Sequence, residues 1–315
     1  MSLFAPIEPY ATHMLPVTDG HTLYVEESGN PGGLPVLVLH GGPGSGCTPD
    51  HRRRFDPAVW RIVCLDQRGC GRSVAPEQGV LHANTTPHLV ADNEAVRKAL
   101  GVTQWACVYG TSWGSTLALV YAETHPDVLQ SMVLGGIWLA DEEGFAWWTD
   151  PMGLPQMLPN EFKKVQAYGP GLKGRDLLKA VLQSGEEAIE AQIYYESMAA
   201  ELDPQPEGVR AYLQTPQGRN GSVLELTYMA QRCYLEDGQI LVNISKIAHL
   251  PITILQGLQD MVCPPKGAHK LAEALRAAGG NPTLRMVGAC GHRSTPAMEA
   301  ARVEAIAAMA QHLQV

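Results

Sequence analysis

The stretch WACVYGTSWGSTLALVYAETH (residues 105–125) predicts a strand, a sharp turn and a helix in direct succession. Residues 105–109 form a short apolar run typical of a buried strand, and residues 115–125 follow a helical pattern. Between them GTSWG fits G-x-S-x-G, in which a strand-to-helix turn exposes a serine hydroxyl above the sheet edge. The two glycines are needed because side chains there would collide with the neighbouring strand and helix. The stretch therefore predicts Ser112 as a nucleophile.

Strands and helices alternate on both sides of this turn. Further strand-like runs lie at residues 22–26, 36–39, 61–65, 131–134, 252–256 and 283–287. Helical patterns lie at residues 88–100, 266–278 and 298–313. This alternation predicts the α/β class, with a mostly parallel central sheet and helices on both of its faces. No helix separates the first strands, so we expect the sheet to open with an antiparallel hairpin.

The middle of the chain has a different pattern. Strand-like runs vanish between residues 140 and 245, and helical patterns occur at residues 176–182 and 186–200. We therefore predict a mainly helical cap domain over residues 140–245. The core domain then consists of residues 1–139 and 246–315.

Composition and charge exclude several classes of protein. The chain has 315 residues, of which 45% are hydrophobic, and a net charge of −9. No block of Lys and Arg is present, so nucleic-acid binding and binding to anionic membranes are not expected. No apolar run reaches the roughly 18 residues that span a bilayer. The first residues lack a basic segment followed by an apolar one, so we expect no signal peptide.

The cysteines and histidines give no sign of a disulfide framework or a metal site. Seven cysteines are scattered along the chain without a C-x-x-C pair, and the eleven histidines show no H-E-x-x-H spacing. We expect reduced, mostly buried thiols in a cytoplasmic protein, and neither a metal nor a cofactor.

A serine nucleophile needs a base to remove its proton and an acid to orient that base. In this architecture the acid and then the histidine follow the serine along the chain. Asp260 follows the strand at 252–256, and His292 follows the strand at 283–287. Both therefore lie at the carboxyl ends of strands, where open α/β sheets place their sites. We predict Asp260 as the orienting acid and His292 as the base.

Other residues compete for the two roles. Asp141 follows the strand at 131–134 and is the rival acid. His40, His249 and His269 are poorer candidates for the base, because His40 precedes the serine and the other two precede the last strand.

The segment His40-Gly41-Gly42-Pro43-Gly44 supplies the remaining part of a hydrolytic site. A tetrahedral intermediate needs two N–H donors for its oxyanion. The residue after the nucleophile, Trp113, offers one amide, and a glycine-rich loop after an early strand offers the other. We predict the amide of Gly42 as the second donor.

Together these motifs resemble the proline iminopeptidase (prolyl aminopeptidase) family of serine peptidases. The matching segments are IEPY (7–10), HGGPG (40–44), DQRGCGRS (66–73), NTT (84–86), LVADNEAVRKALGV (89–102) and GTSWGSTLALVYAETHP (110–126). The resemblance implies an α/β-hydrolase fold and a cytosolic serine exopeptidase that needs no cofactor. Its substrate would be a small peptide with an N-terminal proline, and a helical cap would cover the site.

The resemblance also implies acidic groups that hold the free α-ammonium of the substrate. Glu196, in IYYESMA, matches one family glutamate. A second family glutamate falls on Gln231, in MAQRCY, so the charge at the ammonium site is reduced by one. Either Glu225 or Glu236 substitutes for it, or the substrate differs.

For the proline ring the resemblance implies an aromatic pocket, and Trp138 and Trp148 match its positions. Two departures surround the site. Gly135 stands where the family has arginine, and Arg293-Ser294-Thr295 replaces Ser-Ala-Phe after His292. The alternative function is an esterase, lactonase or amidase that uses the same five catalytic groups on a small uncharged substrate.

Overall fold

The computed structural model describes residues 2–313 and contains one eight-stranded sheet in the order β1-β2-β4-β3-β5-β6-β7-β8. The strands are β1 (Ala11–Pro16), β2 (Thr22–Gly29), β3 (Leu34–Leu39), β4 (Trp60–Asp66), β5 (Cys107–Thr111), β6 (Met132–Gly135), β7 (Ile252–Gly257) and β8 (Thr283–Val287). All neighbours from β4 to β8 pair in parallel, whereas β1 with β2 and β2 with β4 pair antiparallel. The prediction of a mostly parallel sheet is confirmed.

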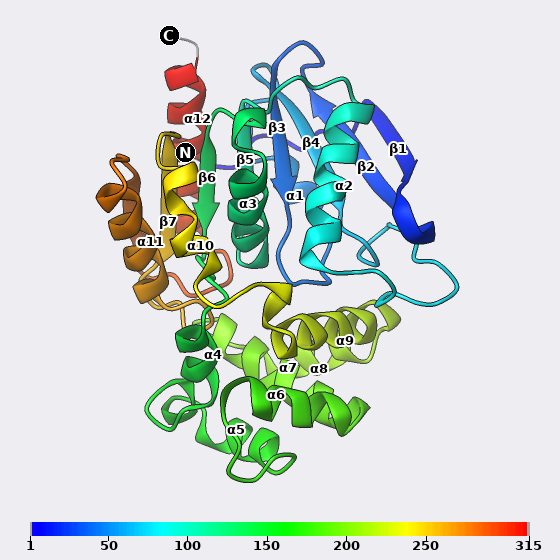
Figure 1. The fold of residues 1–315 in the computed structure, drawn as a ribbon, viewed down its shortest axis with the longest axis vertical. Helices are drawn as coiled ribbons and strands as arrows, with labels where there is room; N and C mark the ends of the chain where they lie inside the picture. Colours follow the sequence, from blue (N-terminus) through cyan, green and yellow to red (C-terminus); the bar gives the residue numbers. More distant parts are fainter. Residues whose placement is uncertain (1, 314–315) are drawn as a thin grey trace.

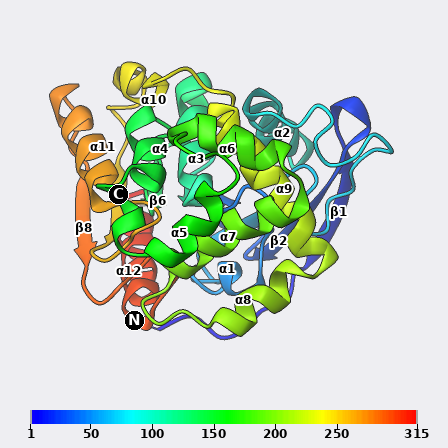
Figure 2. The ribbon, with the colours of Figure 1, turned by 90° about the horizontal axis from the view of Figure 1, so that it is seen from below.

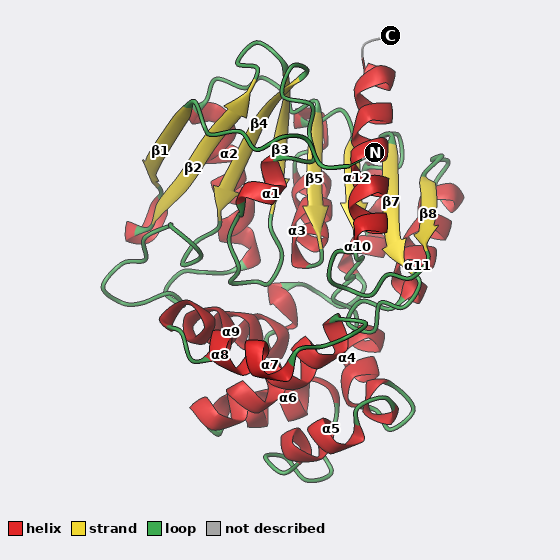
Figure 3. Ribbon diagram, turned by 180° about the vertical axis from the view of Figure 1, so that it is seen from behind, coloured by secondary structure: helices red, strands yellow, loops and turns green. Residues whose placement is uncertain are grey.

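Helices cover both faces of this sheet, as predicted. The helices outside the predicted cap are α1 (Pro49–Arg52), α2 (Thr86–Ala99), α3 (Trp113–Thr124), α11 (Pro265–Ala277) and α12 (Pro296–Leu313). Near the end of the predicted cap, α10 (Gln239–Val242) contacts α3. Figure 1 shows α2 and α3 in front of the sheet, and the opposite view in Figure 3 shows α1 and α12 in front of it. Among residues 2–313, no helix is both long and apolar enough to cross a membrane.

Strand β3 explains why two layers of helix are needed. Leu37 and Leu39 pack in the cluster that includes α2, α3 and α11, while Val36 and Val38 pack in the cluster that includes α12. All four side chains are fully buried. Because successive side chains of a strand point to opposite faces, a continuous apolar run requires cover on both sides.

A layer of helices lies beneath the carboxyl ends of the parallel strands (Figures 1 and 2). It contains α4 (Glu142–Thr149), α5 (Pro159–Gln166), α6 (Gly174–Gln183), α7 (Glu186–Ala200), α8 (Pro206–Leu213) and α9 (Pro216–Ala230). Short 3₁₀ helices complete the chain: η1 (Thr18–Gly20), η2 (Pro126–Val128), η3 (Leu154–Gln156), η4 (Arg232–Tyr234) and η5 (Ile244–Lys246). The helices α4 to α9 lie within the predicted cap, whose boundaries at residues 140 and 245 stay a prediction.

The N-terminal edge of the sheet differs from the expectation. Strand β1 was not predicted, and it forms the opening hairpin with β2. The strand expected at residues 36–39 is not part of that hairpin, because β3 lies between β4 and β5. The edge strand has alternating half-buried and exposed side chains and contains His13 and Pro16, so its sequence carries a weak strand signal.

Candidate active site

The predicted turn between β5 and α3 places Ser112 in a strained backbone conformation, with φ 56° and ψ −129°. A Cβ atom at Gly110 would lie 2.1 Å from the carbonyl oxygen of Gly114, and one at Gly114 would lie 2.2 Å from that of Leu39. Any side chain at either position would therefore collide with backbone. The Ser112 amide donates to the carbonyl of Gly135 at 2.9 Å, which helps to hold the turn.

Three side chains from distant parts of the chain meet at this turn. The Nε2 atom of His292 lies 3.0 Å from the Oγ atom of Ser112, and its Nδ1 atom lies 2.9 Å from Oδ2 of Asp260. Asp260 lies in the loop after β7, and His292 in the loop after β8. A carboxylate on Nδ1 keeps the proton there and leaves Nε2 free to accept a proton from serine. The structure thus brings together the three residues that were predicted as nucleophile, base and acid.

Backbone and side-chain N–H donors surround the carboxylate of Asp260. Its side chain is buried, and its Oδ1 atom accepts hydrogen bonds from the amides of Val262 at 3.1 Å and Cys263 at 2.7 Å. The side-chain amide of Gln256 donates to Oδ2 at 3.2 Å. These donors fix the plane of the carboxylate that faces Nδ1 of His292.

The competing residues lie in other settings. Asp141 accepts a hydrogen bond from the amide of Gly144 at 2.9 Å, at the start of α4, and pairs with Lys270. His249 and His269 are exposed, before β7 and on α11. In the described part of the chain, no group of three or more His, Cys, Asp or Glu side chains is arranged to hold a metal ion.

His40 has a different role, which sequence reasoning missed. The amide of Gln67 donates to its Nε2 atom at 3.0 Å, and its Nδ1 atom lies 2.8 Å from the carbonyl oxygen of Gly41 and 3.2 Å from the amide nitrogen of Gly46. Burial lowers the pKa of His40, so the ring stays neutral. The Gln67 side chain also accepts from the indole N–H of Trp113 at 2.8 Å. His40 and Gln67 therefore tie the loop that contains Gly42 to the start of α3.

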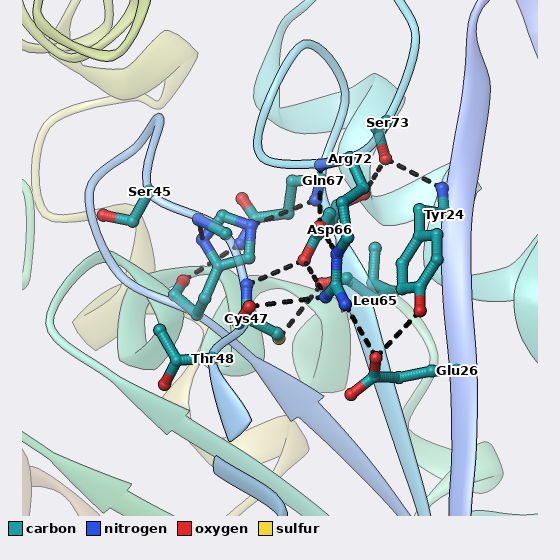
Figure 4. A network of polar contacts seen from close by, with 12 residues as sticks. Tyr24, Glu26, Ser45, Cys47, Thr48, Leu65, Asp66, Gln67, Arg72 and Ser73 are labelled. Carbon is teal, nitrogen blue, oxygen red and sulfur yellow. Dashed lines mark hydrogen bonds and ion pairs between the residues drawn. The ribbon is translucent and has the colours of Figure 1, made fainter. Parts of the chain in front are cut away.

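The far end of the glycine loop is anchored by a second polar network, drawn in Figure 4. The amide of Cys47 donates to Oδ1 of Asp66 at 2.7 Å, and Nε of Arg72 donates to Oδ2 at 2.7 Å. Arg72 also pairs with Glu26 at 2.8 Å and lies 3.8 Å above the ring of Tyr24. Both ends of the loop are thus held by side chains of β2 and β4, or of the turn after β4.

Both predicted oxyanion donors lie next to Ser112. Gly42 lines the same cavity as the serine, and a Cβ atom on the preceding Gly41 would lie 3.3 Å from the serine Cβ. Trp113 is the first residue of α3, so its amide has no acceptor within the helix. That these two amides stabilise an oxyanion formed at Ser112 stays a prediction.

A cavity of about 500 Å³ opens above the serine, between the sheet and the cap helices. Ser112 and His292 line it from the core, and Glu196 of α7 and Glu225 of α9 line it from the cap. The two carboxyl groups lie close enough to influence each other's charge. Burial raises the pKa of Glu225 to about 7, and burial together with the neighbouring Glu225 raises the pKa of Glu196 well above its ordinary value. Two neighbouring carboxyl groups form a ready binding site for a cation, because a positive charge between them relieves their mutual repulsion.

Gln231 does not take part in this cavity, which corrects the prediction made for it. It is an exposed residue at the carboxyl end of α9, and the cavity is lined instead by Glu225. The two positions are six residues apart, which turns a helical side chain by about 240° to a different face. Of the two substitutes that the sequence left open, Glu225 is the one beside Glu196, whereas Glu236 is exposed after η4.

The two predicted aromatic residues are also not among the residues that line the cavity. Trp138 and Trp148 are buried, and their rings stack with centroids 5.1 Å apart. The indole N–H of Trp148 donates to the carbonyl of Val262 at 2.9 Å. Trp138 borders a separate cavity of about 360 Å³ beside α4 and α11. Trp148 thus links α4 to the loop that carries Asp260, while Trp138 packs on α4 through the ring of Phe145.

The sheet order, the turn at Ser112 and the three hydrogen-bonded side chains define a class, the serine hydrolases with an α/β-hydrolase fold. A family model described as alpha/beta hydrolase fold matches residues 35–294. A proline iminopeptidase of Neisseria meningitidis serogroup A is 38% identical over 97% of this chain and 98% of its own. One of Arabidopsis thaliana is 38% identical over 92% of this chain and 77% of its own. The chain belongs to the proline iminopeptidase family of α/β hydrolases.

Solved structures agree on the fold. A proline iminopeptidase-related protein from Thermus thermophilus matches with a TM-score of 0.65 and 23% identity, over 96% of this chain and 98% of its own. An esterase from Exiguobacterium antarcticum matches with a TM-score of 0.66 and 19% identity, over 95% and 97% of the two chains. At such identities the likeness concerns the fold alone.

Proposed function

We propose that this protein is a serine exopeptidase that releases N-terminal proline from small peptides. One observation carries the proposal: the paired carboxyl groups of Glu196 and Glu225 line the same cavity as Ser112 and His292. A charge-assisted hydrogen bond from an ammonium group to such a pair selects a chain end over the middle of a peptide. The names of the relatives that are 38% identical support the same activity.

In the proposed reaction the Oγ atom of Ser112 attacks the carbonyl carbon of the N-terminal proline while His292 takes the hydroxyl proton. The amides of Gly42 and Trp113 stabilise the oxyanion. His292 then gives the proton to the nitrogen of the second residue, the C–N bond breaks, and a prolyl ester remains on Ser112. Water, deprotonated by His292, hydrolyses that ester. Asp260 keeps the imidazole oriented and stabilises its protonated form.

The proposed cellular setting is the cytoplasm. All seven cysteines are unpaired in the structure, and six of them are buried. Unpaired thiols suit a reducing compartment. No metal or cofactor takes part in the proposed reaction.

A substrate panel tests the proposal. The panel contains free and N-blocked proline arylamides, alanine arylamide and p-nitrophenyl acetate. We expect hydrolysis of the free proline arylamide and none of the blocked one, because blocking removes the ammonium charge. If only the ester is hydrolysed, the protein is an esterase on the same scaffold and the exopeptidase proposal fails.

The carboxyl pair predicts a specific pH dependence. Because the pKa of Glu225 is raised to about 7, its carboxyl is neutral below that pH and charged above it. The measured quantity is the ratio of kcat/KM for proline arylamide to kcat/KM for p-nitrophenyl acetate. As pH rises through 7, this ratio should therefore increase by up to about tenfold. The ester serves as the reference because any titration of the base affects both substrates.

The variant Glu225→Gln should lose the pH-dependent increase of kcat/KM for proline arylamide relative to the ester. Its kcat/KM for proline arylamide should also fall by about 10-fold to 100-fold. Glu236→Gln is the matched control, because Glu236 is exposed and outside the cavity. Equal losses on the arylamide and the ester in Glu225→Gln would contradict a role in ammonium binding.

A further inference from the structure

We propose that Arg293 binds a carboxylate on the leaving part of the substrate. The enzyme then prefers prolyl peptides whose second residue carries a negative charge close to the scissile bond. That charge is either the α-carboxylate of a dipeptide or an acidic side chain. The inference rests on the proposed exopeptidase function and extends it to the other side of the cleaved bond.

The position of Arg293 is fixed by the loop after β8. It directly follows His292 and lines the cavity above Ser112. Its amide donates to the carbonyl of Ala200 at 2.8 Å, at the end of α7. Its guanidinium pairs with Glu201 at 3.1 Å and remains 57% exposed. The arginine is therefore held at the cavity wall by its backbone while its charged group stays accessible.

The chemistry of the reaction places the leaving group beside this residue. Nε2 of His292 lies 3.0 Å from Oγ of Ser112, and the same atom must deliver the proton to the leaving nitrogen. The leaving nitrogen therefore lies next to the imidazole. In a dipeptide the carboxylate carbon is two bonds further on, about 2.5 Å from that nitrogen. A flexible arginine side chain one residue after His292 is well placed to reach it.

The charges in the cavity make such a contact useful. Three carboxyl groups line the cavity, from Glu196, Glu201 and Glu225. Among the described residues that line it, Arg293 is the only lysine or arginine. The positive charge of Arg293 also lowers the pKa of Glu225, which burial raises. The electrostatic effect of Arg293 therefore extends to a carboxyl group that lines the cavity. An anionic leaving group would be repelled by this acidic lining without a cation near it.

The pair of Arg293 with Glu201 does not block this role. The two side chains are 57% and 28% exposed, and exposed ion pairs contribute little because water screens them. A substrate carboxylate can therefore replace Glu201 as the partner at small cost. Arginine suits the exchange because its planar group binds a carboxylate through two parallel N–H donors.

The test compares matched pairs of substrates. The first pair is Pro-Gly and Pro-Gly-NH₂, which differ by the α-carboxylate, and the second is Pro-Asp-NH₂ and Pro-Asn-NH₂, which differ by the side-chain charge. Within each variant the ratio of kcat/KM for the two members is measured, so that a general loss of activity cancels. We expect the natural protein to favour the charged member of at least one pair by about fivefold. The pair that shows the preference identifies the source of the carboxylate.

Three variants separate the explanations. Arg293→Gln should reduce the ratio to about one or below, because the acidic lining is left unopposed. Glu201→Gln should raise the ratio, because the guanidinium loses its competing partner, and this variant leaves Arg293 in place. Arg210→Gln on α8 is the matched control, because Arg210 lies outside the cavity and contacts Tyr194.

The outcomes are distinct. Ratios near one in the natural protein, or equal ratios in the natural protein and Arg293→Gln, overturn the role of Arg293 but leave the exopeptidase function intact. If the natural protein hydrolyses p-nitrophenyl acetate and none of the four peptides, the proposed function itself fails, and the inference fails with it.

Discussion

Replacement of Ser112 by alanine lowers kcat for proline arylamide and for p-nitrophenyl acetate by about 10⁴-fold to 10⁶-fold. The reason is that the variant loses the nucleophilic hydroxyl. In the natural protein this hydroxyl, at the start of α3, lies 3.0 Å from Nε2 of His292. Alanine keeps the Cβ atom at the strained turn and introduces no new contact. The variant should therefore fold, and it should still bind a prolyl compound. Thermal unfolding with and without added prolinamide checks this point, while initial rates measure the loss of activity.

The matched control for this prediction is Ser184→Ala. Ser184 is an exposed residue at the end of α6, so its hydroxyl is remote from the reaction. It should keep activity within about twofold, in the range of surface substitutions that touch no special feature. If Ser112→Ala retains substantial hydrolysis of either substrate, then the peptidase and the esterase hypotheses are both wrong.

The parts of the structure that could be predicted from the sequence are those with a local cause. The turn at Ser112 needs glycine on either side, because a Cβ atom at Gly110 or Gly114 would meet backbone at 2.1 or 2.2 Å. A strand, this turn and a helix can thus be recognised in one continuous stretch, residues 105–125. Asp260 and His292 could be proposed because each follows a strand whose end must lie at the same edge of the sheet.

The parts that could not be predicted depend on contacts across long stretches of chain. Strand β1 has no continuous apolar run and is stabilised by pairing with β2. His40 was judged as a possible base, and its actual role depends on Gln67, 27 residues later. The DQRGCGRS segment contains Gln67, but its sequence alone does not show that Gln67 contacts His40.

The cap shows the same limit. The family resemblance implies that the second acidic position is Gln231, whereas Glu225 is the residue that lies beside Glu196 in the structure. The face that a cap residue presents depends on where α7 and α9 lie relative to each other, and no local pattern encodes that. Trp138 and Trp148 illustrate it further, since their aromatic character suited a ring pocket but their rings stack in the interior.

Asp260→Asn should lower kcat by about 10³-fold to 10⁴-fold on both proline arylamide and p-nitrophenyl acetate. The Oδ1 atom of Asp260 accepts hydrogen bonds from the amides of Val262 and Cys263. Its Oδ2 atom faces Nδ1 of His292. An asparagine satisfies those two amides only with its oxygen, so its NH₂ group faces Nδ1. The imidazole must then carry its proton on Nε2, where it cannot accept one from Ser112.

Because Asp260→Asn impairs proton transfer, kcat should decrease with little change in KM. The decrease should be similar for proline arylamide, which is charged, and for p-nitrophenyl acetate, which is not. Asp141→Asn is the decisive comparison, since Asp141 is the other acid at the end of a neighbouring strand. Its carboxylate caps α4 and pairs with Lys270, so this variant should lose some thermal stability and keep its activity within about threefold. A larger loss of kcat in Asp141→Asn than in Asp260→Asn would reverse the assignment of the orienting acid.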